Sequence, residues 1–194
     1  MLSDRIQTLS PSLTIAISSL ARDLKAQGKD ILSFSAGEPD FETPKRIKDE
    51  AIKAINEGFT QYTAVPGIPE LLEAISEKLK RDNGLAYAPA DIIVSNGAKQ
   101  SLFNLFQATL NDGDEVIIPA PYWVTYPELV KYAGAVPVVI DTDEIAGFKI
   151  TAEQLKAAIT PKTKMLILTT PSNPTGSVYS EAELRSLAEV LEGT

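Results

Sequence analysis

Residues 114–140 read DEVIIPAPYWVTYPELVKYAGAVPVVI, and this stretch decides the fold. It contains two short runs rich in β-branched residues, 115–118 and 136–140, with a helical pattern over 124–133 between them. A strand, a helix and a second strand in this order make a crossover unit whose two strands run parallel. We therefore expect an α/β fold with a mainly parallel sheet.

The same alternation continues on both sides of this stretch. Runs at 92–94 and 165–169 predict two further strands. Further helices are predicted at 14–27, 44–56, 68–83, 99–110, 151–159 and from 180 onward. The last two begin with capping boxes, Thr151 with Gln154 and Ser180 with Glu183. Because the alternation calls for a strand after the last helix, we expect the chain to end inside a domain.

The composition is that of a globular protein acting on a small molecule. The sequence holds 18 basic and 26 acidic residues, and the net charge of −8 disfavours nucleic acids and anionic membranes as partners. Histidine and cysteine are absent, which excludes Ser-His and Cys-His catalysis, disulfides and metal sites built on these ligands, and we expect no metal. Charged residues interrupt the apolar stretches of residues 1–30, so we expect no leader or membrane span and a cytoplasmic protein.

A turn at 95–100, SNGAKQ, is a candidate phosphate site because it joins a predicted strand to a helix. The unpaired first-turn N–H groups and the helix dipole attract an anion there, and Gly97 lets a phosphate approach the backbone. The turn matches neither GxxxxGK[ST] nor GxGxxG, which disfavours ATP and dinucleotides. The alternative is a plain strand-to-helix turn.

Two further loops offer an aromatic ring and an amide. Trp123 follows the 115–118 strand, at the end where ligands of α/β sheets bind, and could stack on a planar ring or be a core residue. Asn173 stands between Pro171 and Pro174, which stiffen a loop of an otherwise common kind, and a cis Asn173–Pro174 bond would suit it. Together the three loops predict a pocket for a planar, phosphorylated aromatic cofactor.

Five motifs resemble, in order and spacing, the class I aminotransferases of PLP fold type I, and most of all their bacterial-type aspartate aminotransferase subgroup. They are 35–41 (SAGEPDF), Tyr62 with 67–71 (GIPEL), 97–100 (GAKQ), 121–123 (PYW) and 173–176 (NPTG). The resemblance implies a three-layer α/β/α fold with a mainly parallel sheet. It assigns 1–40 to an N-terminal arm and leading helix on the small-domain side, and 41–194 to the N-terminal part of an incomplete PLP-binding large domain.

The resemblance also implies which residues bind pyridoxal 5'-phosphate. Gly97 and Ala98 would hold its phosphate, Trp123 would stack on its pyridine ring, and Asn173 would bond its 3-oxygen. Tyr62 would reach the phosphate of the neighbouring subunit, which implies a homodimer. Without the resemblance, Tyr62 would be an ordinary packing residue.

The substrates implied are amino acids and 2-oxo acids. The substrate-binding residues would be Gly37, Lys99, Trp123, Asn173, Thr14 and Ser12. Gly37 would meet the α-carboxylate, and Lys99, with Thr14 and Ser12 nearby, would recognise the distal carboxylate of an acidic substrate. Taken alone, Lys99 would be interpreted as a solvated helix lysine and Gly37 as a turn residue.

The same family uses an aspartate, a Schiff-base lysine and two arginines that have no matching position in these 194 residues. We therefore assign no catalytic residue and expect the chain alone to be inactive. For the full-length protein the resemblance implies transfer of an amino group between L-aspartate or L-glutamate and 2-oxo acids, with prephenate as a related alternative. A non-catalytic PLP-binding protein and a Rossmann-like nucleotide binder are alternatives of other classes. An incomplete sheet predicts poor solubility or association in isolation.

Overall fold

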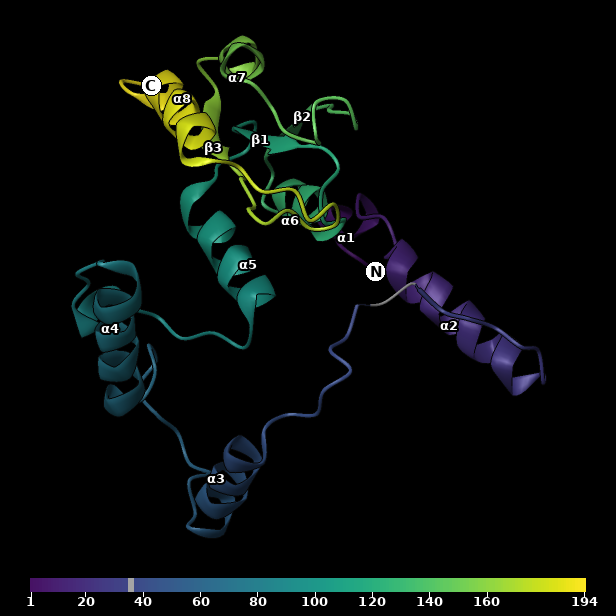
Figure 1. The fold of residues 1–194 in the computed structure, drawn as a ribbon, viewed down its shortest axis with the longest axis vertical. Coiled ribbons are helices and arrows are strands. Elements are labelled where there is room, and N and C mark those ends of the chain that lie inside the picture. The colour runs from purple at the N-terminus through teal and green to yellow at the C-terminus, as the bar shows by residue number, and fades with distance from the viewer. Residues whose placement is uncertain (35–36) are drawn as a thin grey trace. The chain divides into compact units, whose positions relative to one another are not determined.

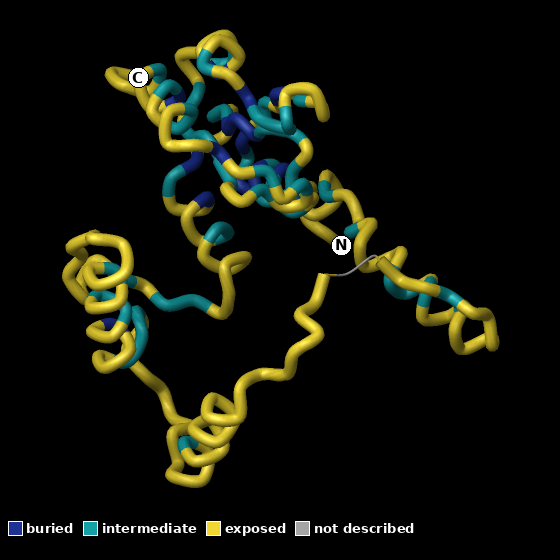
Figure 2. Tube along the Cα trace, viewed as in Figure 1, coloured by how far each residue is buried: buried dark blue, intermediate teal, exposed yellow. Residues whose placement is uncertain are grey.

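The computed structural model describes residues 1–34 and 37–194. The chain divides into two compact units, one made of residues 1–16 and 102–194 and the other of residues 17–101. The first unit contains the sheet and most of the buried residues, which appear in dark blue along the strands in Figure 2. Ser35 and Ala36, the first residues of the motif at 35–41, lie outside the described residues.

In the described part of the first unit, three strands form one parallel sheet (Figure 1). The central strand β1 (Glu115–Pro119) lies between β2 (Val136–Ile140) and β3 (Thr163–Leu166). Ile117 of β1 is in register with Val138 of β2 and with Leu166 of β3. Strand β1 has apolar residues on both faces because helices cover both sides of the sheet.

The two faces of β1 belong to two separate hydrophobic clusters. Val116 and Ile118 pack with Phe106 and Val130, which come from α5 (Ala98–Thr109) and α6 (Thr125–Tyr132). Ile117, which points to the opposite face, packs in the second cluster. That cluster includes residues of α7 (Ala152–Ala158) and α8 (Glu181–Leu191). Helices, sheet and helices thus form three layers, and the predicted α/β class with a parallel sheet is confirmed.

Local sequence patterns predicted the positions of α5, α6, α7 and α8 to within one or two residues at the bounds that were predicted. Thr151 Oγ1 accepts from the Gln154 N–H at 3.2 Å while Gln154 Oε1 accepts from the Thr151 N–H at 2.9 Å. Ser180 and Glu183 form the same reciprocal pair, at 3.3 and 2.7 Å. Both predicted capping boxes are therefore confirmed, and such a cap stabilises a helix by about 1 kcal/mol. The short helix α1 (Asp4–Gln7) was not predicted.

The second unit consists mainly of helices. It contains most of α2 (Leu13–Ala26), then α3 (Lys45–Asn56), α4 (Pro69–Asn83) and a 3-10 turn, η1 (Pro89–Asp91), which was not predicted. Gly84 caps the end of α4, and its φ of 67° lies in the left-handed region, which costs glycine little. Among the described residues, no helix is long and apolar enough to cross a bilayer.

The predicted strand at 92–94 is wrong. Residues 92–94 belong to no ladder; the Ile92 N–H donates to the Pro89 oxygen at 3.3 Å and the Val94 N–H to the Pro66 oxygen at 2.8 Å. Ile93 is 72% exposed. A β-branched run becomes a strand only where a neighbouring strand pairs with it, and the described residues supply none there. Strand β3 also begins earlier and ends earlier than the predicted 165–169.

Candidate functional site

A small cavity lies in the first unit at the carboxyl ends of β1 and β3, and its volume of about 20 Å³ is room for about one water molecule. Pro119 lines it from the end of β1, Tyr122 from the segment before α6, and Tyr126 from the first turn of that helix. Thr169 and Asn173 line it from the loop after β3. This is the edge of a parallel sheet at which α/β proteins bind ligands.

The loop that carries Asn173 is held in a defined shape. The Ser172 N–H donates to the Ser177 oxygen and the Gly176 N–H donates to the Ser172 oxygen, both at 2.8 Å. The Asn173–Pro174 peptide is cis, as the sequence suggested. Asn173 itself lines the cavity and is exposed, so it is accessible to a ligand at this edge of the sheet.

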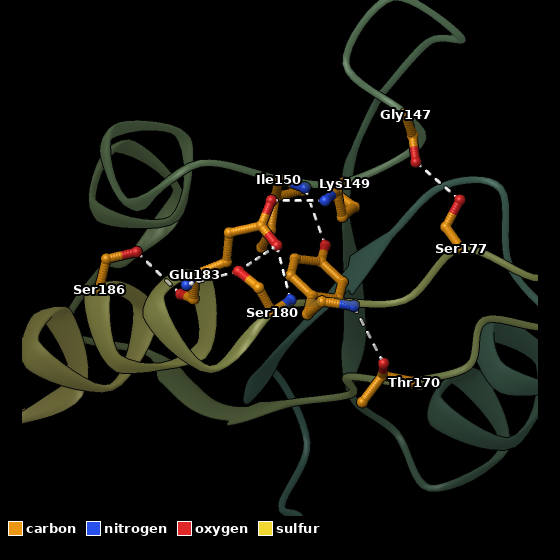
Figure 3. A network of polar contacts seen from close by, with 9 residues as sticks. Gly147, Lys149, Ile150, Thr170, Ser177, Ser180, Glu183 and Ser186 are labelled. Atoms are coloured by element: carbon orange, nitrogen blue, oxygen red, sulfur yellow. Dashed lines mark hydrogen bonds and ion pairs between the residues drawn. The ribbon is translucent and has the colours of Figure 1, made fainter.

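A polar network joins this loop to residues 147–150 (Figure 3). The Thr170 Oγ1 accepts from the Tyr179 N–H at 3.2 Å, and Ser177 Oγ donates to the Gly147 oxygen at 2.7 Å. The Tyr179 hydroxyl oxygen accepts from the Ile150 N–H at 2.8 Å. Burial raises the pKa of Tyr179, so this hydroxyl stays protonated well into the alkaline range. The loop is therefore held at Thr170 by Tyr179, a member of the second hydrophobic cluster, and at Ser177 by the backbone of Gly147.

An ion pair completes the network on the solvent side. Lys149 Nζ donates to Glu183 Oε1, and the Ser180 N–H and hydroxyl donate to Glu183 Oε2. The hydrogen bond from Lys149, followed by those from Ser180, lowers the pKa of Glu183 to about 2. The carboxylate is therefore ionised at neutral pH and ties the start of α8 to residue 149.

Trp123 lies just before α6 and is half-buried. Its ring meets the ring of Tyr126 edge to face, with centroids 5.4 Å apart and planes at 87°. Its neighbour Tyr122 lines the cavity and packs against the first hydrophobic cluster. The segment 122–126 therefore presents several aromatic rings at the carboxyl end of β1.

The candidate phosphate turn precedes α5 as predicted, although the part of the chain that the structure describes has no strand directly before it. Gly97 has a φ of 88°, and a Cβ at this position would meet nothing within 4 Å among the described residues. Backbone conformation rather than space thus favours glycine at this position. Helix α5 begins at Ala98, and the residues from Asn96 to Gln100 are all exposed. Its first turn has the geometry of an anion site.

The remaining candidates lie in several segments. Gly37 and Tyr62 are exposed residues of the second unit, as is Lys99 in the first turn of α5. Ser12 Oγ accepts from the Ile15 N–H at 3.4 Å at the start of α2, and Thr14 follows in its first turn. Of the predicted site residues, the structure brings Asn173 to the cavity within the first unit, where Trp123 borders Tyr126.

Sequence reasoning did not single out most of the residues that line this cavity, among them Tyr126, Thr169 and Phe148. Tyr126 and Thr169 lie directly beside the predicted loops, so their position near a binding edge could have been noticed. Phe148 carries no sequence signal of this kind. Its φ of 57° is unusual for a residue with a side chain and is visible only in the structure.

Comparison with known proteins identifies the family. The model of the class I and II aminotransferases matches residues 29–193. The aspartate aminotransferase of Bacillus sp. strain YM-2 is 55% identical over 190 residues, covering 98% of this chain and 48% of that protein. The aspartate/prephenate aminotransferase of Cereibacter sphaeroides is 56% identical with the same coverage. The chain thus spans about half the length of the curated relatives it matches.

Solved structures agree with the sequence comparison. The aspartate aminotransferase from Thermus thermophilus with maleate superimposes with a TM-score of 0.95 at 48% identity, covering 99% of this chain and 50% of that chain. The aspartate aminotransferase from Rhizobium meliloti gives 0.93 at 48% identity, covering 98% of this chain and 48% of that chain. With a family model matching most of its length and relatives identical at about half of its residues, the chain belongs to the class I and II aminotransferases.

Proposed function

We propose that the full-length protein is an aspartate aminotransferase that uses pyridoxal 5'-phosphate to move an amino group between L-aspartate or L-glutamate and 2-oxo acids. The observation that carries this proposal is an identity of 55–56% over almost the whole chain with relatives named for aspartate. Within the class, residues 1–40 would form the arm and leading helix, and 41–194 would belong to the cofactor-binding domain. We further propose a cytoplasmic homodimer.

The residues present fit this cofactor, which is a flat aromatic ring with a phosphate. The cavity edge offers aromatic rings at 122–126 and the exposed amide of Asn173. The open turn at Gly97 and the start of α5 offer backbone N–H groups to an anion. When bound, pyridoxal phosphate supplies the electron sink that amino-group transfer needs.

Each candidate residue then has a binding role. Gly97 and Ala98 hold the phosphate through the backbone, because a helix N-terminus carries partial positive charge. Trp123 stacks on the ring, and the Asn173 amide donates to the ring oxygen. Tyr62 reaches the phosphate bound by the partner subunit, so the active site requires the dimer.

Substrate selection falls to a second group of residues. The Gly37 backbone and the Asn173 and Trp123 side chains bind the α-carboxylate end of the substrate. Lys99, assisted by Ser12 and Thr14, binds the distal carboxylate. The Thermus relative is described with maleate, a dicarboxylate of the size of aspartate, which supports an acidic substrate.

The test uses the full-length enzyme with L-aspartate and L-alanine as amino donors. The Lys99→Ala variant removes one charge-assisted hydrogen bond, so kcat/KM for aspartate should fall by about 10-fold to 100-fold while that for alanine changes little. Lys156→Ala, at an exposed lysine of α7, is the matched control and should leave both values unchanged. An equal loss with both donors would refute the role of Lys99, and a wild-type enzyme inactive on aspartate would refute the proposed function.

Prephenate is a second candidate acceptor, because two relatives at 55–56% identity are named aspartate/prephenate aminotransferase. Aspartate and prephenate are both dicarboxylates, so a cation at Lys99 is compatible with either substrate. Assays of the full-length enzyme with oxaloacetate and with prephenate as acceptors distinguish them. Failure with both acceptors would contradict the acidic-substrate assignment.

A further inference from the structure

Tyr126 contacts two parts of the candidate site, Trp123 and the threonine that precedes the loop of Asn173. The proposed function gives Tyr126 itself no role. It lies in the first turn of α6 and lines the cavity together with Asn173. Its ring also packs against the first hydrophobic cluster, which includes Phe106 and Val116. Tyr126 is therefore anchored in the core and exposed to the cavity at the same time.

On one side Tyr126 holds Trp123. The two rings meet edge to face at 5.4 Å, and the Tyr126 N–H donates to the Trp123 oxygen at 3.0 Å. Edge-to-face contacts of this kind have a preferred geometry because the positive rim of one ring meets the negative face of the other. The orientation of the Trp123 ring is therefore coupled to that of Tyr126.

On the other side Tyr126 reaches the loop after β3. Its hydroxyl lies 3.1 Å from Thr169 Oγ1, a part-buried hydrogen bond between residues 43 positions apart. Thr169 directly precedes the loop 170–176, which carries Asn173. One side chain thus contacts both the segment with the aromatic ring and the segment with the amide.

We infer that Tyr126 is a positioning residue that sets the ring of Trp123 against the loop of Asn173, so that a planar cofactor meets both in one orientation. The inference rests on the proposed function, since it assumes that Trp123 and Asn173 bind one ligand. Trp123 and Asn173 can bind one cofactor ring together only if the distance between them is constant. Contacts from Tyr126, which is anchored in the core, hold that distance constant.

The test compares Tyr126→Phe, Thr169→Val and the double variant of the full-length protein. Pyridoxal phosphate binding is measured by titration of the cofactor-free protein. The part of the near-UV circular dichroism tryptophan bands that a Trp123→Phe variant loses reports the environment of Trp123. Each single variant should raise the Kd about twofold to tenfold, the worth of one neutral hydrogen bond. The double variant should be no weaker than either single variant, because both remove the same contact.

Thr169→Val changes no aromatic residue, so a change in the tryptophan bands of this variant would show that the contact is transmitted through Tyr126 to Trp123. Tyr132→Phe is the matched control, since Tyr132 ends the same helix and its ring pairs with Phe103 at 5.5 Å. It should alter neither the Kd nor the tryptophan bands. Thermal melting of all variants excludes loss of fold as the cause.

Unchanged binding and unchanged tryptophan bands in both single variants would overturn the inference while leaving the proposed function intact. So would losses that multiply in the double variant, since these indicate independent contacts. A wild-type protein that does not bind pyridoxal phosphate would overturn the proposed function and the inference together.

Discussion

Replacing Tyr179 by phenylalanine removes one oxygen from the centre of the network that holds the Asn173 loop. Tyr179 is 6% exposed and belongs to the second hydrophobic cluster, so the ring keeps its packing in the variant. The lost hydroxyl accepts from the buried Ile150 N–H at 2.8 Å. A buried donor left without a partner costs about 1–3 kcal/mol, and we expect the free energy of unfolding to fall by this amount.

The measurement is urea unfolding of the full-length Tyr179→Phe variant, with the slope of the transition unchanged and the midpoint lowered. Tyr87→Phe is the control because Tyr87 is half-exposed, and it should change the free energy of unfolding by less than about 0.5 kcal/mol. A Tyr179→Phe variant as stable as the wild type would show that the hydroxyl contributes nothing to the free energy of unfolding.

The same hydroxyl predicts a pH dependence with a definite sign. Burial raises the pKa of Tyr179 above its ordinary value of 10.0, so the folded state binds this proton more tightly than the unfolded chain does. Its contribution is complete below pH 10 and is lost as the pH rises through the raised pKa. The stability difference between wild type and Tyr179→Phe should therefore shrink above pH 10, and a constant difference would refute this reasoning.

Two further predictions concern an ion pair and a turn. The pKa of Glu183 is lowered from 4.5 to about 2 by Lys149 and Ser180, so its contribution to stability is complete above pH 4.5 and is lost between pH 4.5 and 2. The melting temperature of the wild type should fall more steeply over this range than that of Glu183→Gln, and parallel curves would contradict the prediction. At Gly134 the φ is 87° and a Cβ would overlap the Asp112 carboxylate, so Gly134→Ala should lower the free energy of unfolding by about 1–3 kcal/mol. Gly113→Ala, with a φ of 85° and nothing within 4 Å of the added Cβ among the described residues, should cost less in the same thermal melts, and equal losses would exclude the overlap as the cause.

Helix positions were predictable because their signals are local. Capping boxes at Thr151 and Ser180 and the left-handed stop at Gly84 act within one turn of the helix they bound. The strand at 92–94 was predicted by the same kind of local pattern and is wrong. A strand, unlike a helix, takes its hydrogen bonds from another part of the chain. A run of β-branched residues alone therefore says little about whether a partner is present.

In the candidate site, too, some features could be predicted from local sequence and others could not. The loop of Asn173 could be recognised from its prolines, and the turn at Gly97 from its place before a helix. The contact of Tyr126 with Thr169 spans 43 positions, and the network of Tyr179 joins residue 150 to the loop at 170–176. Such contacts depend on which strands become neighbours in the sheet, so no local sequence pattern could predict them.

The sequence by itself determined the α/β alternation, most helix bounds and the loops that carry candidate binding groups, because periodicity, caps and prolines act over a few residues. Only the tertiary structure decided that β1 lies between β2 and β3, which brings the loops after β1 and β3 to one cavity. It also decided which side chains brace that cavity. These outcomes depend on packing between distant segments, where burial of β1 on both faces selects one arrangement of the sheet.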